Sequence, residues 1–356
     1  MKVIIAGGGT GGHVFPAISI AEEILKRDPE NEVLFVGTKS GLENKLVAQR
    51  GYEIKHINSG GIVGKGLFKR VSGVFSAAVG TIESASVIRS FKPDVVLGVG
   101  GYVSGPVVLS ASILRLPTAI CEQNSIPGVT NRILSKFVSS IFTTFEGCDK
   151  FFSTDKIIVT GNPIRKDILG SKSKPAQLDS FTCLVFGGSQ GAKRLNSSVP
   201  EALSRSGIKD LRVIHQTGAN DLKNVQDFYN KHNISADVLT FIDDMAGAYA
   251  RSDFVIGRAG AGTVAEITAL GKPSLLIPFP YATHNHQLEN AKTLETSGAA
   301  LLIEDEDATP ENLAQALEVF QDEGKLKEMS LRARALGKPG AAAQIVDEIY
   351  KLSGVN

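Results

Sequence analysis

A short apolar run, a glycine-rich turn and an amphipathic helix follow one another twice in this chain. The first copy, KVIIAGGGTGGHVFPA, starts at residue 2, and the second, TCLVFGGSQGAKRLN, starts at residue 182. Units of this kind build parallel sheets that helices cover on both faces. Because the copies start about half the chain apart, the sequence predicts an α/β protein with two Rossmann-like domains in tandem.

The boundaries follow from the same alternation of β-branched runs and helical patterns. A chain of 356 residues exceeds the size at which one hydrophobic core keeps growing. We expect an N-terminal domain over 1–162, a C-terminal domain over 163–340, and a final helix over 341–356 that returns to the N-terminal domain. The polar, proline-bearing stretch 162–180 is the predicted linker.

Composition excludes several classes of protein. The 38 Lys and Arg residues balance 37 Asp and Glu residues, so the chain lacks the overall basic field that binds nucleic acid. The scattered Cys121, Cys148 and Cys183 indicate buried thiols in a reducing compartment rather than disulfides or a metal cluster. With no signal-peptide pattern and no apolar run of about 20 residues, we expect a soluble, cytoplasmic protein.

The first glycine-rich loop has the form of a phosphate-binding turn. Gly7, Gly9 and Gly12 satisfy G-x-G-x-x-G between a strand and a helix, where bare backbone N–H groups meet a pyrophosphate. A dinucleotide site also needs an acidic residue at the end of the second strand, but EVLFVGTKS ends in Gly37 and Thr38. No P-loop signature is present. A tight strand-to-helix turn without a ligand explains the glycines equally well.

His13 adds a candidate base to this loop. An imidazole in the first turn of a helix lies beside the positive end of the helix dipole, which lowers its pKa and keeps it neutral. A histidine that only bonds a neighbouring carbonyl at the helix start is the alternative.

Two more loops of the N-terminal half follow strands. They are GVGGYVSGP at 98–106 and CEQNSIPGVTNR at 121–132. Ligands of parallel sheets collect at the carboxyl ends of the strands, so these loops and the first one should converge. Gln123, Asn124 and Asn131 have the donors and acceptors that bind sugar hydroxyls, although each is also a common turn residue.

The C-terminal half offers a second set of polar loops. GGSQGA can hold a diphosphate through backbone N–H groups and Ser189. In GRAGAGTVAEI we expect a helix that opens at Thr263, with Glu266 in its first turn where a carboxylate binds amides or a ribose diol. HNHQLENA at 284–291 contains two histidines, but no third ligand is nearby, which argues against a metal.

Seven motifs in this order resemble the MurG family of bacterial N-acetylglucosaminyltransferases. They are GGTGGHVFPA, GVGGYVSGP, EQNSIPGVTNR, GNPIR, GGSQGA, GRAGAGTVAEI and HNHQLENA, and they span nearly the whole chain. The resemblance implies a GT-B fold, with two Rossmann-like domains facing a deep cleft. It implies inverting, metal-independent transfer of GlcNAc from UDP-GlcNAc to the C4 hydroxyl of the MurNAc unit of lipid I, without a cofactor. The product, lipid II, serves peptidoglycan synthesis, and through it cell shape and division.

The resemblance also implies roles for single residues. Thr10, Gly11 and Gly12 would lie near the reacting sugar and the acceptor pyrophosphate, with His13 as candidate base. Asn124 would bind GlcNAc, while Arg165 and Ser189 would meet the diphosphate. Ile242 would contact uracil, and Gln287 would bind GlcNAc hydroxyls. The nucleotide would lie along Ala261, Gly262, Thr263, Val264, Ala265 and Glu266, with Glu266 on the ribose.

Three points stay open in this assignment. Glu122 is an alternative base, and a reaction without a base is another. Where some relatives carry two glutamines, this chain has His286 and Gln287, so the sugar contacts there are not fixed by the resemblance. Another GT-B enzyme, such as a UDP-GlcNAc 2-epimerase or a glycolipid synthase, or a non-catalytic nucleotide-binding module would share part of the pattern.

A membrane-bound acceptor requires a docking surface on the cytoplasmic face of the cell membrane, where we expect the protein to bind peripherally. One predicted helix has an apolar stripe that begins beside the basic residues Lys65, Lys69 and Arg70. An apolar face next to basic residues is the combination that binds anionic bilayers. The stripe comprises Leu67, Val71, Val74, Phe75, Ala78 and Ile82. A helix that packs into the protein core has the same pattern.

Overall fold

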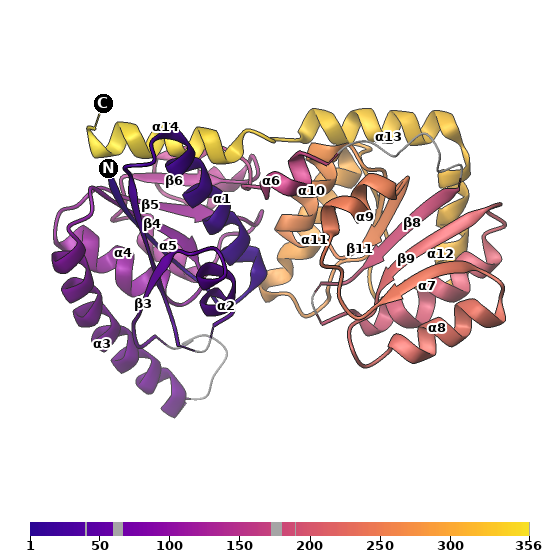
Figure 1. The fold of residues 1–356 in the computed structure, drawn as a ribbon, viewed down its shortest axis with the longest axis horizontal. Coiled ribbons are helices and arrows are strands. Elements are labelled where there is room, and N and C mark those ends of the chain that lie inside the picture. The colour runs from indigo at the N-terminus through magenta and orange to yellow at the C-terminus, as the bar shows by residue number, and fades with distance from the viewer. Residues whose placement is uncertain (40, 60–66, 172–179, 189, 356) are drawn as a thin grey trace. The chain divides into compact units, whose positions relative to one another are not determined.

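The chain forms two compact α/β units, each with its own parallel sheet (Figure 1). The computed structural model describes residues 1–39, 41–59, 67–171, 180–188 and 190–355, and it describes 67–78 by their backbone alone. Unit 1 comprises Met1–Arg165 and Pro339–Asn356, and unit 2 comprises Lys166–Lys338. The two parallel sheets confirm the predicted fold class.

Unit 1 contains a sheet of seven strands in the order β3-β2-β1-β4-β5-β6-β7, and every pairing is parallel. The strands are β1 (Lys2–Gly7), β2 (Glu32–Gly37), β3 (Glu53–His56), β4 (Val95–Gly100), β5 (Thr118–Glu122), β6 (Ser140–Thr143) and β7 (Ile157–Val159). The helices are α1 (Gly11–Arg27), α2 (Glu43–Ala48), α3 (Leu67–Phe91), α4 (Ser104–Ile113), α5 (Val129–Leu134), the 3-10 helix η1 (Cys148–Phe151) and α14 (Ala341–Ser353).

Helices cover both faces of this sheet. Alternate residues of β1 and β4 point into a core that α1 and α14 complete, and Ile5, Leu97 and Ile20 are fully buried there. On the other face α4 packs on β4. Gly98 leaves room for Val108 at that point, because a Cβ on Gly98 would lie 2.8 Å from a methyl group of Val108.

Unit 2 contains a sheet of six parallel strands in the order β10-β9-β8-β11-β12-β13. The strands are β8 (Phe181–Phe186), β9 (Leu211–Gln216), β10 (Ser235–Leu239), β11 (Phe254–Gly257), β12 (Ser274–Leu276) and β13 (Leu301–Leu302). The helices are α6 (Lys166–Leu169), α7 (Lys193–Arg205), α8 (Leu222–Lys231), α9 (Met245–Arg251), α10 (Ala261–Leu270), α11 (His286–Thr296), α12 (Pro310–Leu317) and α13 (Glu323–Leu336), with 3-10 helices η2 (Thr283–Asn285) and η3 (Glu318–Gln321).

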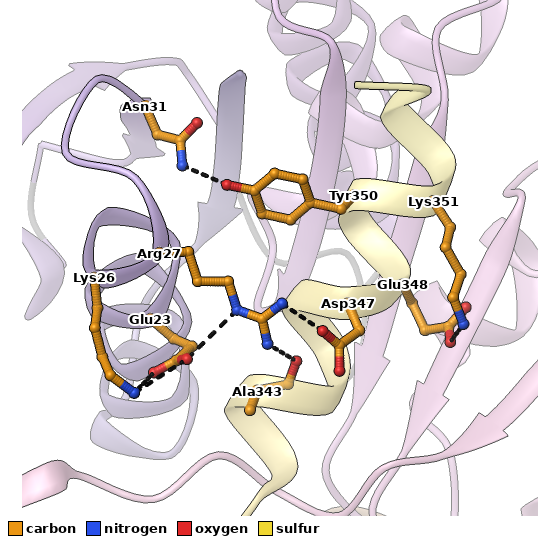
Figure 2. Close-up of polar contacts among 9 residues, drawn as sticks. All are labelled: Glu23, Lys26, Arg27, Asn31, Ala343, Asp347, Glu348, Tyr350 and Lys351. Carbon is orange, nitrogen blue, oxygen red and sulfur yellow. Dashed lines mark hydrogen bonds and ion pairs between the residues drawn. The ribbon is translucent and has the colours of Figure 1, made fainter. Parts of the chain in front are cut away.

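The last helix, α14, packs against α1, far from it in sequence (Figures 1 and 2). Figure 2 shows Arg27 of α1 donating to the carbonyl of Ala343 at 3.0 Å and pairing with Asp347. The amide of Asn31 donates to the hydroxyl of Tyr350 at 2.7 Å. Ile349 of α14 is fully buried in the core of unit 1. The C-terminal helix therefore completes the hydrophobic core of unit 1.

Among the residues that the structure describes, no helix is both long and apolar enough to cross a bilayer.

Truncating α14 in its core should destabilise unit 1. We expect Ile349→Ala to lower the free energy of unfolding by about 2–5 kcal/mol, because a fully buried side chain leaves a cavity. The exposed Lys351→Ala is the matched control and should cost no more than about 0.5 kcal/mol. Native-state hydrogen exchange at β1 measures both. Equal protection of β1 in the two variants would contradict the role of α14.

Candidate active site

Both sheets place glycine-rich loops at the point where the strand order reverses. In unit 1, β1 and β4 are neighbours although they are not consecutive, and in unit 2 the same holds for β8 and β11. Such reversal points open a crevice at the carboxyl ends of the strands, where ligands of doubly wound sheets bind. Each unit therefore has one candidate site.

In unit 1 the loops after β1 and β4 touch through glycine backbone. A Cβ on Gly100 would lie 2.6 Å from Nδ1 of His13, and a Cβ on Gly101 would lie 2.5 Å from the carbonyl oxygen of Gly8. Both glycines also have positive φ, 104° and 79°. Any side chain at either position would push the two loops apart, so the glycines bring the His13 imidazole against the β4 loop.

The first turn of α1 contains the predicted residues Thr10 to His13. Thr10 is the N-cap residue in an extended conformation, and α1 begins at Gly11. The amide of His13 donates to the carbonyl of Thr10 at 3.1 Å. Thr10 and Gly12 are exposed. Because first-turn amides have no acceptor within their own helix, Gly11 and Gly12 present N–H groups at a positive helix end that suits an anion.

Arg165 belongs to this unit. Its guanidinium lies over the ring of Phe15, 5.1 Å from the centroid, and the same ring packs against Gly11. Ile164 beside it is buried. The first segment of unit 1 runs to Arg165, where 162 was the expected end of the domain, and the contact with Phe15 brings a cation to the start of α1.

The third loop is organised by a buried carboxylate. Glu122 at the end of β5 accepts hydrogen bonds from the backbone amides of Asn124 and Gly128, both at 3.0 Å, and from the side-chain amide of Asn131 at 2.8 Å. Burial raises the pKa of Glu122, and these hydrogen bonds oppose that rise. Glu122 therefore fixes the loop, which leaves Asn124, partly exposed, at its surface.

Two residues that were open between a sugar contact and a structural role bind backbone carbonyls. The side chain of Gln123 donates to the carbonyl of Val99 at 2.9 Å, and that of Asn131 donates to the carbonyl of Cys121 at 3.0 Å. Both side chains are buried. Gln123 joins the end of β5 to the neighbouring β4, and Asn131 joins α5 to β5.

In unit 2, Gln216 links two of the predicted contact segments. Its amide donates to the carbonyl of Gly188 at 2.6 Å, and its Oε1 accepts the backbone N–H of Ile242 at 3.1 Å. Ser189, the predicted diphosphate contact, lies outside the described residues. Gln216 therefore holds the segment of Ile242 in register with the loop after β8.

A buried histidine stabilises the same region. His215 at the end of β9 contacts the hydroxyl of Tyr229 at 3.0 Å and Oδ1 of Asn196 at 3.2 Å. Burial lowers the pKa of His215 to about 3, so the ring is neutral at ordinary pH. Asn196 in turn donates to the carbonyl of Thr217 at 2.8 Å.

The helix after β11 starts earlier than expected. Gly260 is its N-cap and α10 begins at Ala261, so Ala261, Gly262 and Thr263 form its first turn. The expectation that the helix opens at Thr263 with Glu266 in the first turn was wrong, because Gly260 already has the extended backbone of a cap. Glu266 lies in the second turn, where its Oε2 accepts the hydroxyl of the buried Tyr249 at 2.8 Å.

Gln287 borders a cavity of about 380 Å³ next to the β8 loop. Its Oε1 accepts the backbone N–H of Phe279 at 3.0 Å. Arg258, also in the lining, donates to the carbonyls of Ile277 and Pro278 and pairs with Asp305 at 2.5 Å. The cavity combines backbone glycine, an amide and basic side chains, a set that suits a phosphorylated ligand.

The two histidines at 284 and 286 lie in the 3-10 helix η2 and at the start of α11. His286 contacts the carbonyl of Thr283 at 2.7 Å through Nδ1. Within the described part of the chain, no three His, Cys, Asp or Glu side chains are placed to share a metal ion.

Sequence reasoning missed three residues of these sites: Glu43, Gln216 and Arg258. Gln216 and Arg258 are buried polar residues, Gln216 at the end of β9, which neighbours β8, and Arg258 just after β11. A polar residue at that place in an apolar strand pattern is a signal that would have found them. Glu43 lies beyond the end of β2 and is described below.

Known proteins resemble the chain along nearly its whole length. Residues 3–143 match the glycosyltransferase family 28 N-terminal domain, and residues 182–345 match the glycosyltransferase family 28 C-terminal domain. A relative from Syntrophus aciditrophicus is 48% identical over 98% of this chain and 97% of its own. One from Myxococcus xanthus is 46% identical over 98% and 92%. Both are named "UDP-N-acetylglucosamine--N-acetylmuramyl-(pentapeptide) pyrophosphoryl-undecaprenol N-acetylglucosamine transferase".

Solved structures give the same picture. The crystal structure of Acinetobacter baumannii MurG superposes with a TM-score of 0.82 at 33% identity and covers 98% of this chain and 99% of its own. A UDP-N-acetylglucosamine 2-epimerase superposes with a TM-score of 0.69 at 17% identity, over 100% of this chain and 97% of its own. At that identity the likeness extends to the fold alone.

Proposed function

The chain belongs to glycosyltransferase family 28 and within it to the MurG family, and we propose that it transfers GlcNAc from UDP-GlcNAc to lipid I. The acceptor group is the C4 hydroxyl of the MurNAc unit, and the product is lipid II for peptidoglycan synthesis. The observation that carries the proposal is 48% identity to a transferase of that name over 98% of the chain. The fold has the expected GT-B class, which its epimerase neighbours share without sharing comparable sequence.

The donor is assigned to unit 2. The N–H of Ile242 is already donated to Gln216, so Ile242 would read uracil through its carbonyl oxygen. Glu266, oriented by Tyr249, would accept hydrogen bonds from the ribose diol. The first-turn amides Ala261 to Thr263 would meet the nucleotide at the positive end of α10, and Gln287 would bind GlcNAc hydroxyls.

The acceptor is assigned to the loops of unit 1. Gly11 and Gly12 would bind its pyrophosphate, and His13 would take the proton of the C4 hydroxyl as that oxygen attacks C1 of GlcNAc. The C1–O bond to UDP breaks with its electron pair on UDP, and attack from the opposite face inverts C1. The buried and hydrogen-bonded Glu122 is disfavoured as the base, since its carboxylate already accepts bonds from its own loop.

No metal is needed in this scheme. Helix N-termini, backbone amides, Ser189 and Arg165 would neutralise the diphosphate as UDP leaves, and Asn124 would orient GlcNAc. Arg165 and Ser189 keep the roles that the motifs imply.

The assay for this function uses UDP-GlcNAc, a soluble lipid I analogue and excess EDTA. We expect transfer to persist in EDTA, and we expect Glu266→Ala to raise the KM for UDP-GlcNAc about tenfold while kcat changes less, because a ribose contact exists in ground and transition states alike. Glu328→Ala, an exposed glutamate of α13, is the matched control.

Absence of transfer by the wild-type enzyme would refute the function. Loss in EDTA that Mg²⁺ or Mn²⁺ restores would refute the metal-free scheme, and an unchanged KM in Glu266→Ala would refute the ribose contact.

We also propose that unit 1 contacts an anionic membrane, where lipid I resides. Lys65 lies outside the described residues, and so do the side chains of Lys69, Arg70 and the stripe 67–78. Ile82, the last residue of the stripe, is 73% exposed on α3. Helix α4 packs against α3, and α5 packs against α4. These two helices carry the exposed Ile113 and Ile133.

Basic residues accompany these apolar side chains. Arg115 follows Ile113 closely, and Lys136 precedes the exposed Phe137. Exposed apolar side chains beside Lys and Arg are the combination that binds anionic bilayers peripherally. This supports a docking surface on α3, α4 and α5.

Polar replacement of this surface should separate membrane binding from chemistry. We expect Ile113→Ser combined with Ile133→Ser to weaken sedimentation with phosphatidylglycerol vesicles about tenfold or more, because two side chains lose apolar burial. Transfer to a soluble acceptor should not change. Leu331→Ser, equally exposed on α13 of unit 2, is the matched control. Wild-type sedimentation of the double variant would place the membrane contact elsewhere.

A further inference from the structure

Glu43 has a buried carboxylate that the chemistry above does not use. It is the first residue of α2 and only 1% exposed. Its Oε2 accepts the backbone N–H of Gly9 at 2.8 Å. Its Oε1 accepts the backbone N–H of Thr38 at 2.9 Å and the Thr38 hydroxyl at 3.1 Å. The carboxylate thus joins the loop after β2 to the glycine-rich loop after β1.

The surrounding backbone is shaped for this side chain. A Cβ on Gly8 or on Gly41 would overlap the carboxylate, and a Cβ on Gly37 would lie 2.7 Å from Cγ of Glu43. Three glycines, Gly8 from the loop after β1, Gly37 from the end of β2 and Gly41 from the connection between β2 and α2, therefore enclose one glutamate. Side chains at these positions would exclude the carboxylate, so Gly8 gives the first glycine-rich loop room for an internal anion.

Glu43 differs in place and direction from the acidic residue of a dinucleotide-binding site. In dinucleotide-binding folds an acidic residue at the end of the second strand points outward and binds ribose. Here the acid comes from the next helix and turns inward to bind the amide of Gly9. Every described hydrogen-bond partner of the carboxylate is a neutral group. The backbone N–H of Gly9, which could otherwise bind a ligand phosphate, therefore donates to the carboxylate of Glu43.

The loop is held from both sides just before its reactive residues. Glu43 binds it at Gly9, while Gly101 packs against the carbonyl of Gly8 on the side of β4. Thr10 to His13 follow directly. Gly9 itself has φ +91°, a conformation that the hydrogen bond to Glu43 helps to maintain.

We propose that Glu43 is a positioning residue for the acceptor: its buried carboxylate holds Gly9 so that the amides of Gly11 and Gly12 and the imidazole of His13 face lipid I. Glu43 acts through the backbone and touches no substrate. The inference rests on the proposed function, because it assigns the acceptor to this loop.

Glu43→Gln tests this with little change in volume. Both carboxylate oxygens accept N–H donors, so whichever way the new amide turns, its NH₂ group faces an N–H. Glu23→Gln is the matched control. Glu23 is also a buried glutamate of unit 1, but it lies in the second half of α1 and pairs with Lys26 and Arg27.

The experiment compares the change in kcat/KM for the lipid I analogue with the change in KM for UDP-GlcNAc. We expect kcat/KM for the lipid I analogue to fall about tenfold or more, because small misplacement of reacting groups is costly. The KM for UDP-GlcNAc should stay within about twofold of the wild-type value. In Glu23→Gln, both this KM and the kcat/KM for the lipid I analogue should stay within about twofold of wild type. Hydrogen exchange of a peptide covering 8–14 should accelerate in Glu43→Gln alone.

Wild-type kinetics in folded Glu43→Gln, or equal losses for both substrates, would overturn the proposal. Should Glu43→Gln fail to fold, Thr38→Val removes one hydrogen bond and should give a smaller loss confined to the acceptor; wild-type acceptor kinetics there would overturn it too. Failure of the proposed function has a different signature, since the wild-type enzyme itself would then transfer no GlcNAc to the analogue.

Discussion

The reversal of strand order in each parallel sheet determines where backbone N–H groups are left without an acceptor in their own helix, namely at the first turns of α1 and α10. Each set lies where the order of a parallel sheet reverses, and glycine keeps side chains away from it. A helix start offers partial positive charge without a mobile side chain, so an anion can be bound with little loss of side-chain entropy. The sheets, the glycines and the buried polar residues all act to keep these amides in place.

The two units hold their loops with different chemistry. In unit 1, the loops after β1 and β5 are tied by the carboxylates of Glu43 and Glu122. In unit 2, the neutral amide of Gln216 ties the β8 loop to Ile242. Asp305 does lie beside the cavity of unit 2, but Arg258 pairs with it. Because the carboxylate beside this cavity is paired with a cation, the cavity of unit 2 is suited to a negatively charged diphosphate.

The sequence predicted the fold correctly where a local residue pattern is compatible with only one backbone geometry. Glycines after β-branched runs predicted the loops at Gly7 and Gly187 and the parallel sheets beneath them. It was less informative where a side chain has several possible partners. Gln123 and Asn131 had a sugar contact and a structural role as alternatives, and they bind the backbone carbonyls of Val99 and Cys121, partners that only the folded chain brings to them. Glu43 was missed because the dinucleotide rule examines the end of β2, whereas the acid lies on the next helix.

Hydrogen exchange with and without UDP tests whether the donor binds unit 2 and the acceptor binds unit 1. We expect UDP to slow exchange in peptides covering 238–244 and 258–268, which include Ile242 and the first turn of α10. We expect no change in a peptide covering 8–14, whose amides would bind the acceptor and Glu43. Protection of 8–14 by UDP, with 258–268 unchanged, would contradict the assignment.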